Sequence, residues 1–167
     1  MHEASDGKWR SDIYPTTAEG METWKASYRD FILRYAIIAE QANAEQFCIG
    51  TELTRISLEQ PNFWIDLIKE VRTIYAGKIT YAANWYEEFE NITFWDKLDY
   101  VGVQAYFPLT KNKNPTVKEI SNGWNQYFPT FKSIYKKFNR PILFTEMGYK
   151  STAGSAVKPW ELSLIHI

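Results

Sequence analysis

The sequence predicts an α/β protein in which helices cover a parallel β-sheet. Short continuous apolar runs of strand length alternate along the chain with longer segments whose apolar residues recur at helical spacing. Each apolar run stops at polar or aromatic residues, as expected where parallel strands reach a ligand-binding edge. Hydrophobic residues make up 45% of the 167 positions, which suits one sizeable core and not two separate domains.

The first predicted helix covers residues 21–42, because its apolar residues share one helical face: Trp24, Tyr28, Phe31, Ile32, Tyr35, Ile38 and Ala39. A strand follows at residues 47–50, since this apolar run is too short for a helix, and it ends at Thr51 and Glu52. We expect Cys48, the only cysteine, to be a buried structural thiol. A single cysteine permits no intrachain disulfide.

Pro61 opens a second predicted helix with an apolar stripe from Phe63 to Tyr75, and Gly77 is placed to end it. The next strand covers residues 79–83 and ends at Asn84 and Trp85. The acidic and aromatic segment that follows, residues 86–95, predicts a short irregular helix.

A third strand is predicted at residues 100–104 and stops at Ala105 and Tyr106. A helical stripe then runs from Val117 to Phe138, with Pro129 as a point where it can kink. Residues 141–144 form the last predicted strand, which ends at Thr145 and Glu146. We expect Trp24, Trp64 and Trp124, which lie on the helical stripes, to be core residues.

Two architectures share this order of elements, a doubly wound open sheet and a (β/α)8 barrel. Both place ligands at the carboxyl ends of the strands. No G-x-G-x-x-G or G-x-x-x-x-G-K-[ST] motif follows any predicted strand, so a phosphate-binding site has no support.

Composition excludes several classes of partner and chemistry. A formal net charge of −1 creates no field that would attract nucleic acid or an anionic membrane, so we expect neither as a partner. No pair of His or Cys residues has metal-ligand spacing, so we expect no metal and no cofactor. A Ser-His-Asp hydrolase would need a G-x-S-x-G motif, which is absent, and enolate chemistry would need a strand-end Lys or metal-binding acids.

Glu52 and Glu146 are the only carboxylates placed immediately at the ends of predicted strands. A pair of carboxylates on one rim is what glycoside hydrolysis needs, one to protonate the leaving oxygen and the other to attack the anomeric carbon. Retention of configuration requires the two carboxyl groups to lie about 5–5.5 Å apart. Solvated or ion-paired glutamates with no chemical role are the alternative.

Two motifs, Phe47-Cys48-Ile49-Gly50-Thr51-Glu52-Leu53 and Leu143-Phe144-Thr145-Glu146-Met147-Gly148-Tyr149, resemble the fourth and seventh strand motifs of the retaining (β/α)8 glycosidases. More narrowly, the chain resembles glycoside hydrolase family 113, the β-1,4-mannanase-like family, over residues 1–161. The resemblance implies part of a TIM barrel, about strands four to seven with their helices, truncated at both ends. It also implies a retaining endo-acting hydrolase of β-1,4-linked polysaccharide, with β-mannan as the expected substrate.

The resemblance assigns roles to individual residues. Glu52 matches the acid/base and Glu146 the nucleophile, while Tyr106 matches the tyrosine that donates a hydrogen bond to the nucleophile. Thr51 stands where the family's clan commonly has Asn, which weakens a contact to the sugar. The remaining expected substrate-binding residues are His2, Asn84, Trp85 and Gln104.

A non-catalytic carbohydrate-binding barrel that stacks sugars on Trp85 and Tyr106 is the alternative function. Residues 162–167 resemble the translation of a transposon-based sequencing adapter, and we expect them to lie outside the fold. We expect sequence to be missing at both ends, so cytoplasmic and secreted locations are both compatible with the chain. The isolated 167-residue chain is expected to be inactive or insoluble, because a half barrel has open sheet edges and an exposed apolar interior.

Overall fold

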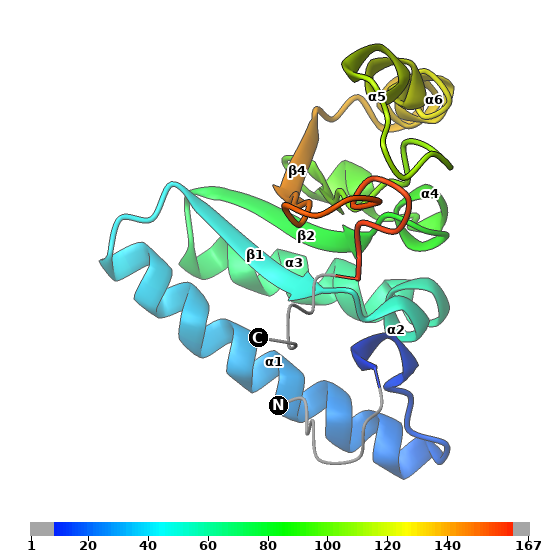
Figure 1. The fold of residues 1–167 in the computed structure, drawn as a ribbon. Coiled ribbons are helices and arrows are strands. Elements are labelled where there is room, and N and C mark those ends of the chain that lie inside the picture. Colours follow the sequence, from blue (N-terminus) through cyan, green and yellow to red (C-terminus); the bar gives the residue numbers. More distant parts are fainter. Residues whose placement is uncertain (1–8, 162–167) are drawn as a thin grey trace.

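The computed structural model describes residues 9–161, and within them it contains one parallel sheet with strand order β1-β2-β3-β4 (Figure 1). The strands are β1 (Gln46–Thr51), β2 (Lys78–Asn84), β3 (Val101–Gln104) and β4 (Ile142–Glu146). Neighbours in sequence are neighbours in the sheet, and helices connect them, as parallel strands require. The predicted α/β fold with a parallel sheet is confirmed, and β1 and β4 form its edges.

The four longer helices lie in segments that were predicted to be helical, although two of them were expected as one continuous stripe. They are α1 (Ala18–Gln41), α3 (Pro61–Ile74), α5 (Val117–Trp124) and α6 (Phe128–Phe138). Helix α1 packs against α3 (Figure 1). The stripe from Val117 to Phe138 is two helices because α5 ends at Trp124, with Asn125 as its C-cap. Pro129 occupies the first turn of α6, where its missing N–H costs nothing.

Several short elements carry no periodic signal and were not predicted: η2 (Arg10–Asp12), α2 (Thr54–Glu59) and η3 (Trp95–Lys97). Helix α4 (Glu88–Asn91) is the short irregular helix expected in residues 86–95. A six-residue helix such as α2 spans fewer than two turns, so a pattern of apolar residues cannot identify it.

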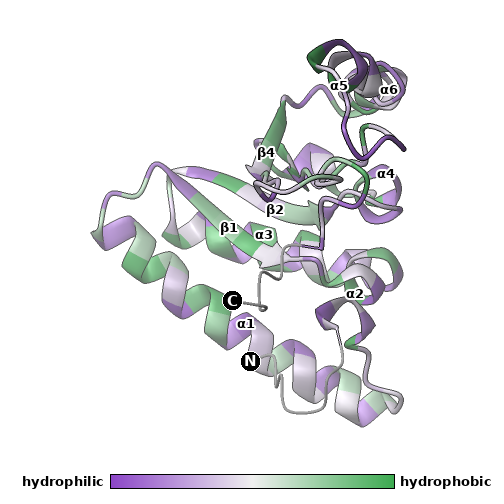
Figure 2. Cartoon of the chain, viewed as in Figure 1, coloured by the Kyte–Doolittle hydropathy of each residue, from purple (hydrophilic) through white to green (hydrophobic). Residues whose placement is uncertain are grey.

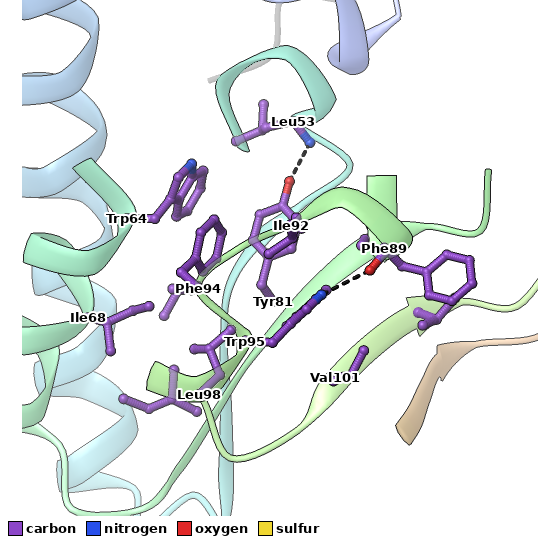
Figure 3. Close-up of a cluster of buried hydrophobic side chains, with 14 of the residues drawn as sticks. Leu53, Trp64, Ile68, Tyr81, Phe89, Ile92, Phe94, Trp95, Leu98 and Val101 are labelled. Atoms are coloured by element: carbon purple, nitrogen blue, oxygen red, sulfur yellow. Dashed lines mark hydrogen bonds between the residues drawn. The ribbon is translucent and has the colours of Figure 1, made fainter. Parts of the chain in front are cut away.

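The core lies between the sheet and its helices and is rich in aromatic side chains (Figure 3). Trp64, Tyr81 and Phe94 are fully buried and pack edge to face or stacked, with ring centroids 5.0–6.2 Å apart. The buried Trp95 indole N–H donates to the Phe89 carbonyl at 2.9 Å. Trp64 is a core residue as predicted, while Trp24 and Trp124 are partly buried and pack against the core.

Two apolar surfaces expected to be buried are exposed. Cys48 lies exposed on the face of β1 that no described helix covers, so the prediction of a buried thiol was wrong. On α1, Phe31, Tyr35 and Ile38 are 46–54% exposed, because α1 is covered mainly on the side that meets α3. Hydrophobic and hydrophilic residues accordingly alternate along α1 (Figure 2). None of the helices in residues 9–161 has the length and apolarity needed to cross a membrane.

The uncovered face of the sheet differs from the exposed apolar interior that was expected. A shallow cavity of about 480 Å³ lies over it, and many of its lining residues are small or polar: Cys48, Thr51, Thr80, Ala82, Gln104 and Thr145. Leu143 and Phe144 are its large apolar members. This face is therefore less hydrophobic than the helix-covered one.

Candidate active site

A cavity of about 690 Å³ opens at the carboxyl ends of the strands. It is lined by Trp9, Arg10, Glu52, Asn84, Trp85, Tyr86, Tyr106, Glu146 and Trp160. The ends of all four strands contribute, since Glu52 follows β1, Trp85 follows β2, Tyr106 follows β3 and Glu146 ends β4. The parallel sheet thus brings five of the predicted site residues to one edge: Glu52, Glu146, Tyr106, Asn84 and Trp85.

Glu52 has an unusual backbone conformation, with φ of 48° in the left-handed region that non-glycine residues rarely adopt. The register between β1 and β2 shifts just before it, between Cys48 and Thr51. Hydrogen bonds fix the backbone on both sides. The Glu52 N–H donates to the Ala82 carbonyl at 2.9 Å, and the Ser11 hydroxyl donates to the Glu52 carbonyl at 3.0 Å. The surrounding structure therefore holds Glu52 in a conformation that the residue alone would avoid.

The Glu52 side chain is buried against the cavity wall and paired with Arg10. The Arg10 Nε donates to Glu52 Oε2 at 3.0 Å. Burial raises the pKa of Glu52 above its usual value, and the negative charge of Glu146 raises it further, while Arg10 lowers it. The net effect is a raised pKa, which favours the protonated carboxyl that a general acid needs.

Glu146 is the more exposed of the two glutamates and accepts a hydrogen bond from the Tyr106 hydroxyl. Burial and the adjacent Glu146 carboxylate both raise the pKa of Tyr106, so this hydroxyl keeps its proton and remains a donor. The donated hydrogen bond fixes the orientation of the Glu146 carboxylate. The predicted Tyr106–Glu146 contact is present.

Aromatic rings form one wall of the cavity. Trp85 and Trp160 are stacked, with ring centroids 5.4 Å apart and planes inclined by 20°. The Asn84 Oδ1 accepts the Tyr86 N–H at 3.0 Å, so the turn after β2 is tied to itself. Flat, partly exposed rings beside polar groups are suited to the faces and hydroxyls of a sugar.

Two predicted substrate-binding residues lie elsewhere. Thr51 and Gln104 line the cavity over the uncovered face of the sheet, which Glu146 also borders, and not the cavity that holds Glu52. The Gln104 Oε1 accepts a hydrogen bond from the Thr145 hydroxyl at 3.2 Å. The substrate-binding roles expected for Thr51 and Gln104 stay predictions. His2 lies outside the described residues.

The sequence analysis assigned no role to two charged residues of the site region. Arg10 contacts Glu52 from 42 positions away, and no local pattern predicts such a pairing. Glu88 lies within the acidic segment 86–95, where a solvated side chain is the ordinary expectation. It is fully buried, and burial raises its pKa while hydrogen bonds from Ser57, Tyr81 and the Asn84 N–H oppose this.

Among residues 9–161, no group of three or more His, Cys, Asp or Glu side chains is arranged to hold a metal ion. The expectation of a cofactor-free site stays a prediction.

The chain has the features of part of a (β/α)8 barrel. These are the β/α order, the parallel sheet and a carboxylate-bearing cavity at the strand ends. The model of Glycoside Hydrolase Family 113 matches the chain over residues 1–166, and the chain belongs to that family. The predicted resemblance is thereby confirmed. The matched range includes most of segment 162–167, whose origin as an adapter stays a prediction.

Solved structures of the same family resemble the chain in three dimensions. The GH113 β-mannanase AaManA from Alicyclobacillus acidocaldarius, in complex with ManMIm, is 30% identical, with a TM-score of 0.78 over 93% of this chain and 47% of that one. A GH113 β-1,4-mannanase solved as a complex is 29% identical, with a TM-score of 0.77 over 95% of this chain and 49% of that one. The chain thus spans about half the length of these structures. A comparison with curated protein sequences found no match.

Proposed function

We propose that the complete protein containing this chain is a retaining glycoside hydrolase that cleaves β-1,4-linked polysaccharide, with β-mannan as its substrate. The observation that carries the proposal is the pair of glutamates over one cavity, with Glu52 buried and raised in pKa and Glu146 hydrogen-bonded to Tyr106. Unlike surroundings are how a fold gives two carboxyl groups an acid role and a nucleophile role.

In the first step, a Glu146 carboxylate oxygen attacks the anomeric carbon while Glu52 gives its proton to the departing glycosidic oxygen. The bond to the leaving sugar breaks as the bond to Glu146 forms. In the second step, Glu52, now a carboxylate, takes a proton from water, and the water oxygen displaces Glu146 from the anomeric carbon.

The electrostatics of the site fit this change of role. Negative charge on Glu146 contributes to the raised pKa of Glu52, and glycosylation of Glu146 removes that charge. Arg10 then favours the ionised form of Glu52, which is the form that accepts a proton from water.

The choice of β-mannan rests on the family and on the β-mannanases that the chain resembles. The stacked rings of Trp85 and Trp160 support a carbohydrate ligand, because sugar faces pack on aromatic rings. A retaining mechanism further predicts a carboxyl separation of about 5–5.5 Å.

The experiment compares the complete protein with its Glu146→Gln and Glu52→Gln variants on β-mannan, cellulose and xylan, with the product anomer followed by NMR. Each variant should lose turnover on mannan by about 100-fold or more, since a nucleophile or acid is removed. The exposed Glu90→Gln is the control and should retain wild-type rates.

Two results would reject the proposal. An initial product with inverted configuration would exclude Glu146 as a nucleophile. Oligosaccharide binding without hydrolysis, unchanged in Glu146→Gln, would instead favour a non-catalytic carbohydrate-binding barrel.

A further inference from the structure

Glu88 is a buried carboxylate that lies behind the cavity and does not line it. Its exposed fraction is 0%, and it is surrounded by an aromatic core that includes Phe89 and Tyr81. Removing a carboxylate from water is costly unless hydrogen bonds replace its hydration. An apolar side chain would fill this position at a lower desolvation cost. The carboxylate therefore needs a role that only a hydrogen-bond acceptor can perform.

The hydrogen bonds of Glu88 reach three different parts of the site's framework. Its Oε1 accepts from the Ser57 hydroxyl of α2 and from the Tyr81 hydroxyl of β2, each at 2.6 Å. Its Oε2 accepts from the Asn84 backbone N–H, where β2 ends, at 2.7 Å. One side chain thus joins α2, β2 and the turn that carries Trp85.

The Tyr81 hydroxyl extends this network to the candidate acid. It accepts the Leu53 N–H at 2.7 Å, as the dashed line between Leu53 and Tyr81 in Figure 3 shows. The Leu53 nitrogen belongs to the peptide bond that directly follows Glu52. Because Glu52 sits in the left-handed region, its orientation depends on such external hydrogen bonds.

We propose that Glu88 is a positioning residue that fixes Glu52, through Tyr81 and Leu53, relative to the Asn84–Trp85 turn that follows the neighbouring strand β2. The inference rests on the proposed function, because it treats Glu52 as the acid of a glycosidase. Glu88 itself touches no substrate in this scheme.

A glutamine at position 88 could not preserve the network. A carboxylate accepts on both oxygens, whereas an amide presents an NH2 group either to the Asn84 N–H or to the two hydroxyls. Glu88→Gln therefore keeps the side-chain volume and loses at least one of these hydrogen bonds. Tyr81→Phe removes the hydrogen bonds of the Tyr81 hydroxyl to Glu88 and Leu53, and leaves the contact of Glu88 with Asn84 in place.

The test compares two substrates in the complete protein by kcat/KM. Cleavage of a β-manno-oligosaccharide needs a proton from Glu52, whereas a dinitrophenyl β-mannoside has a leaving group that departs without one. Glu88→Gln and Tyr81→Phe should lower kcat/KM for the oligosaccharide by about tenfold to a hundredfold, the usual effect of a misplaced catalytic group. The aryl mannoside should be affected at least tenfold less, because kcat/KM excludes the later step in which Glu52 acts as a base.

Asp99→Asn is the matched control. Asp99 accepts the Ile79 N–H at 2.8 Å near the opposite end of β2, so it also binds the backbone through a carboxylate but lies far along the strand from the site. This variant should change kcat/KM for both substrates by the same factor. In any variant, a loss of folded protein would also lower kcat/KM for both substrates equally. An unequal effect on the two substrates therefore indicates a loss of positioning and not a loss of stability.

The outcomes separate the two proposals. A wild-type protein that cleaves neither substrate overturns the proposed function. A wild-type protein that cleaves both, with Glu88→Gln and Tyr81→Phe lowering both equally, overturns the role of Glu88 alone. If Glu88→Gln does not fold, the substrate ratio of Tyr81→Phe decides.

Discussion

At the scale of the residue, the two candidate catalytic glutamates both lie at strand ends but have different surroundings. Glu52 is buried and paired with a guanidinium, while Glu146 is more exposed and accepts a phenolic hydrogen bond. Burial and the guanidinium act on the pKa of Glu52 in opposite directions. Arg10 therefore limits how far the pKa of the acid is raised, which makes its effect measurable.

Replacing Arg10 by methionine should move the alkaline limb of the kcat/KM profile to higher pH. Arg10 lowers the pKa of Glu52, so its removal lets the acid keep its proton as the pH rises. Activity should therefore persist to higher pH than in the wild type, even if the maximum rate is lower. The measurement is kcat/KM for a manno-oligosaccharide across pH in the complete protein.

Arg55→Met is the control for this experiment. Arg55 forms an exposed ion pair with Glu59, so this substitution removes the same charge as Arg10→Met without removing a contact to Glu52. Its profile should keep the wild-type limb. An alkaline limb in Arg10→Met that stays in place, or moves to lower pH, contradicts the assignment of Glu52 as the acid that Arg10 contacts.

The residues that sequence could predict lie at strand ends, and the family resemblance supplied their roles. Glu52, Tyr106 and Glu146 each lie at or just after a strand end, and the short apolar runs of the strands locate those ends. Arg10 and Glu88 form contacts across 42 and 31 positions, so only the folded chain identifies them. Thr51 was also placed at a strand end, but its side chain borders the neighbouring cavity.

At the scale of the element, β1 is shaped to present Glu52. Gly50 comes two residues before Glu52, and its backbone lies against the aromatic core. A Cβ there would lie 2.7 Å from Tyr81 and 2.9 Å from both Trp64 and the Tyr28 hydroxyl. Real Cβ atoms essentially never approach so closely, so only glycine lets the strand pack at this depth.

Gly50→Ala should destabilise the protein by about 1–3 kcal/mol, the usual cost of overpacking a core, and should lower activity because the end of β1 must shift. Urea denaturation of wild type and variant gives the first quantity, and the rate on mannan gives the second. Unfolding midpoints that coincide, together with equal rates, would show that the three rings can move aside at no cost.

Helical periodicity predicted the long helices and short apolar runs predicted the strands, because each element buries a continuous stripe or run. It could not separate α5 from α6, since apolar residues continue at helical spacing through the break between them. Nor could it find α2, whose six residues include only Ile56 and Ser57 as buried positions. Helix α2 carries Ser57, which donates a hydrogen bond to Glu88. The sequence analysis therefore failed to predict both the helix and the buried carboxylate that it contacts.

At the scale of the whole molecule, the sheet has two edges and one uncovered face among the described residues. β1 and β4 each have a single neighbour, and the cavity over the uncovered face includes the side chain of Glu146. The related β-mannanase structures are about twice as long as the part that this chain matches. In a closed barrel, further strands would pair with both edges and enclose that face.

The 167-residue chain alone should therefore self-associate and show no mannan hydrolysis above background, whereas the chain joined to the rest of the barrel should be active. Unpaired strand edges and the half-exposed Phe31, Tyr35 and Ile38 favour association, and an open sheet face leaves Glu146 without the walls that exclude water from a reacting sugar. Size-exclusion chromatography and a mannan assay on both proteins, at matched concentration, provide the comparison. A monomeric 167-residue chain that hydrolyses mannan as fast as the complete protein would mean that Glu52, Glu146 and Tyr106 suffice without the remaining strands, and that barrel closure contributes nothing to catalysis.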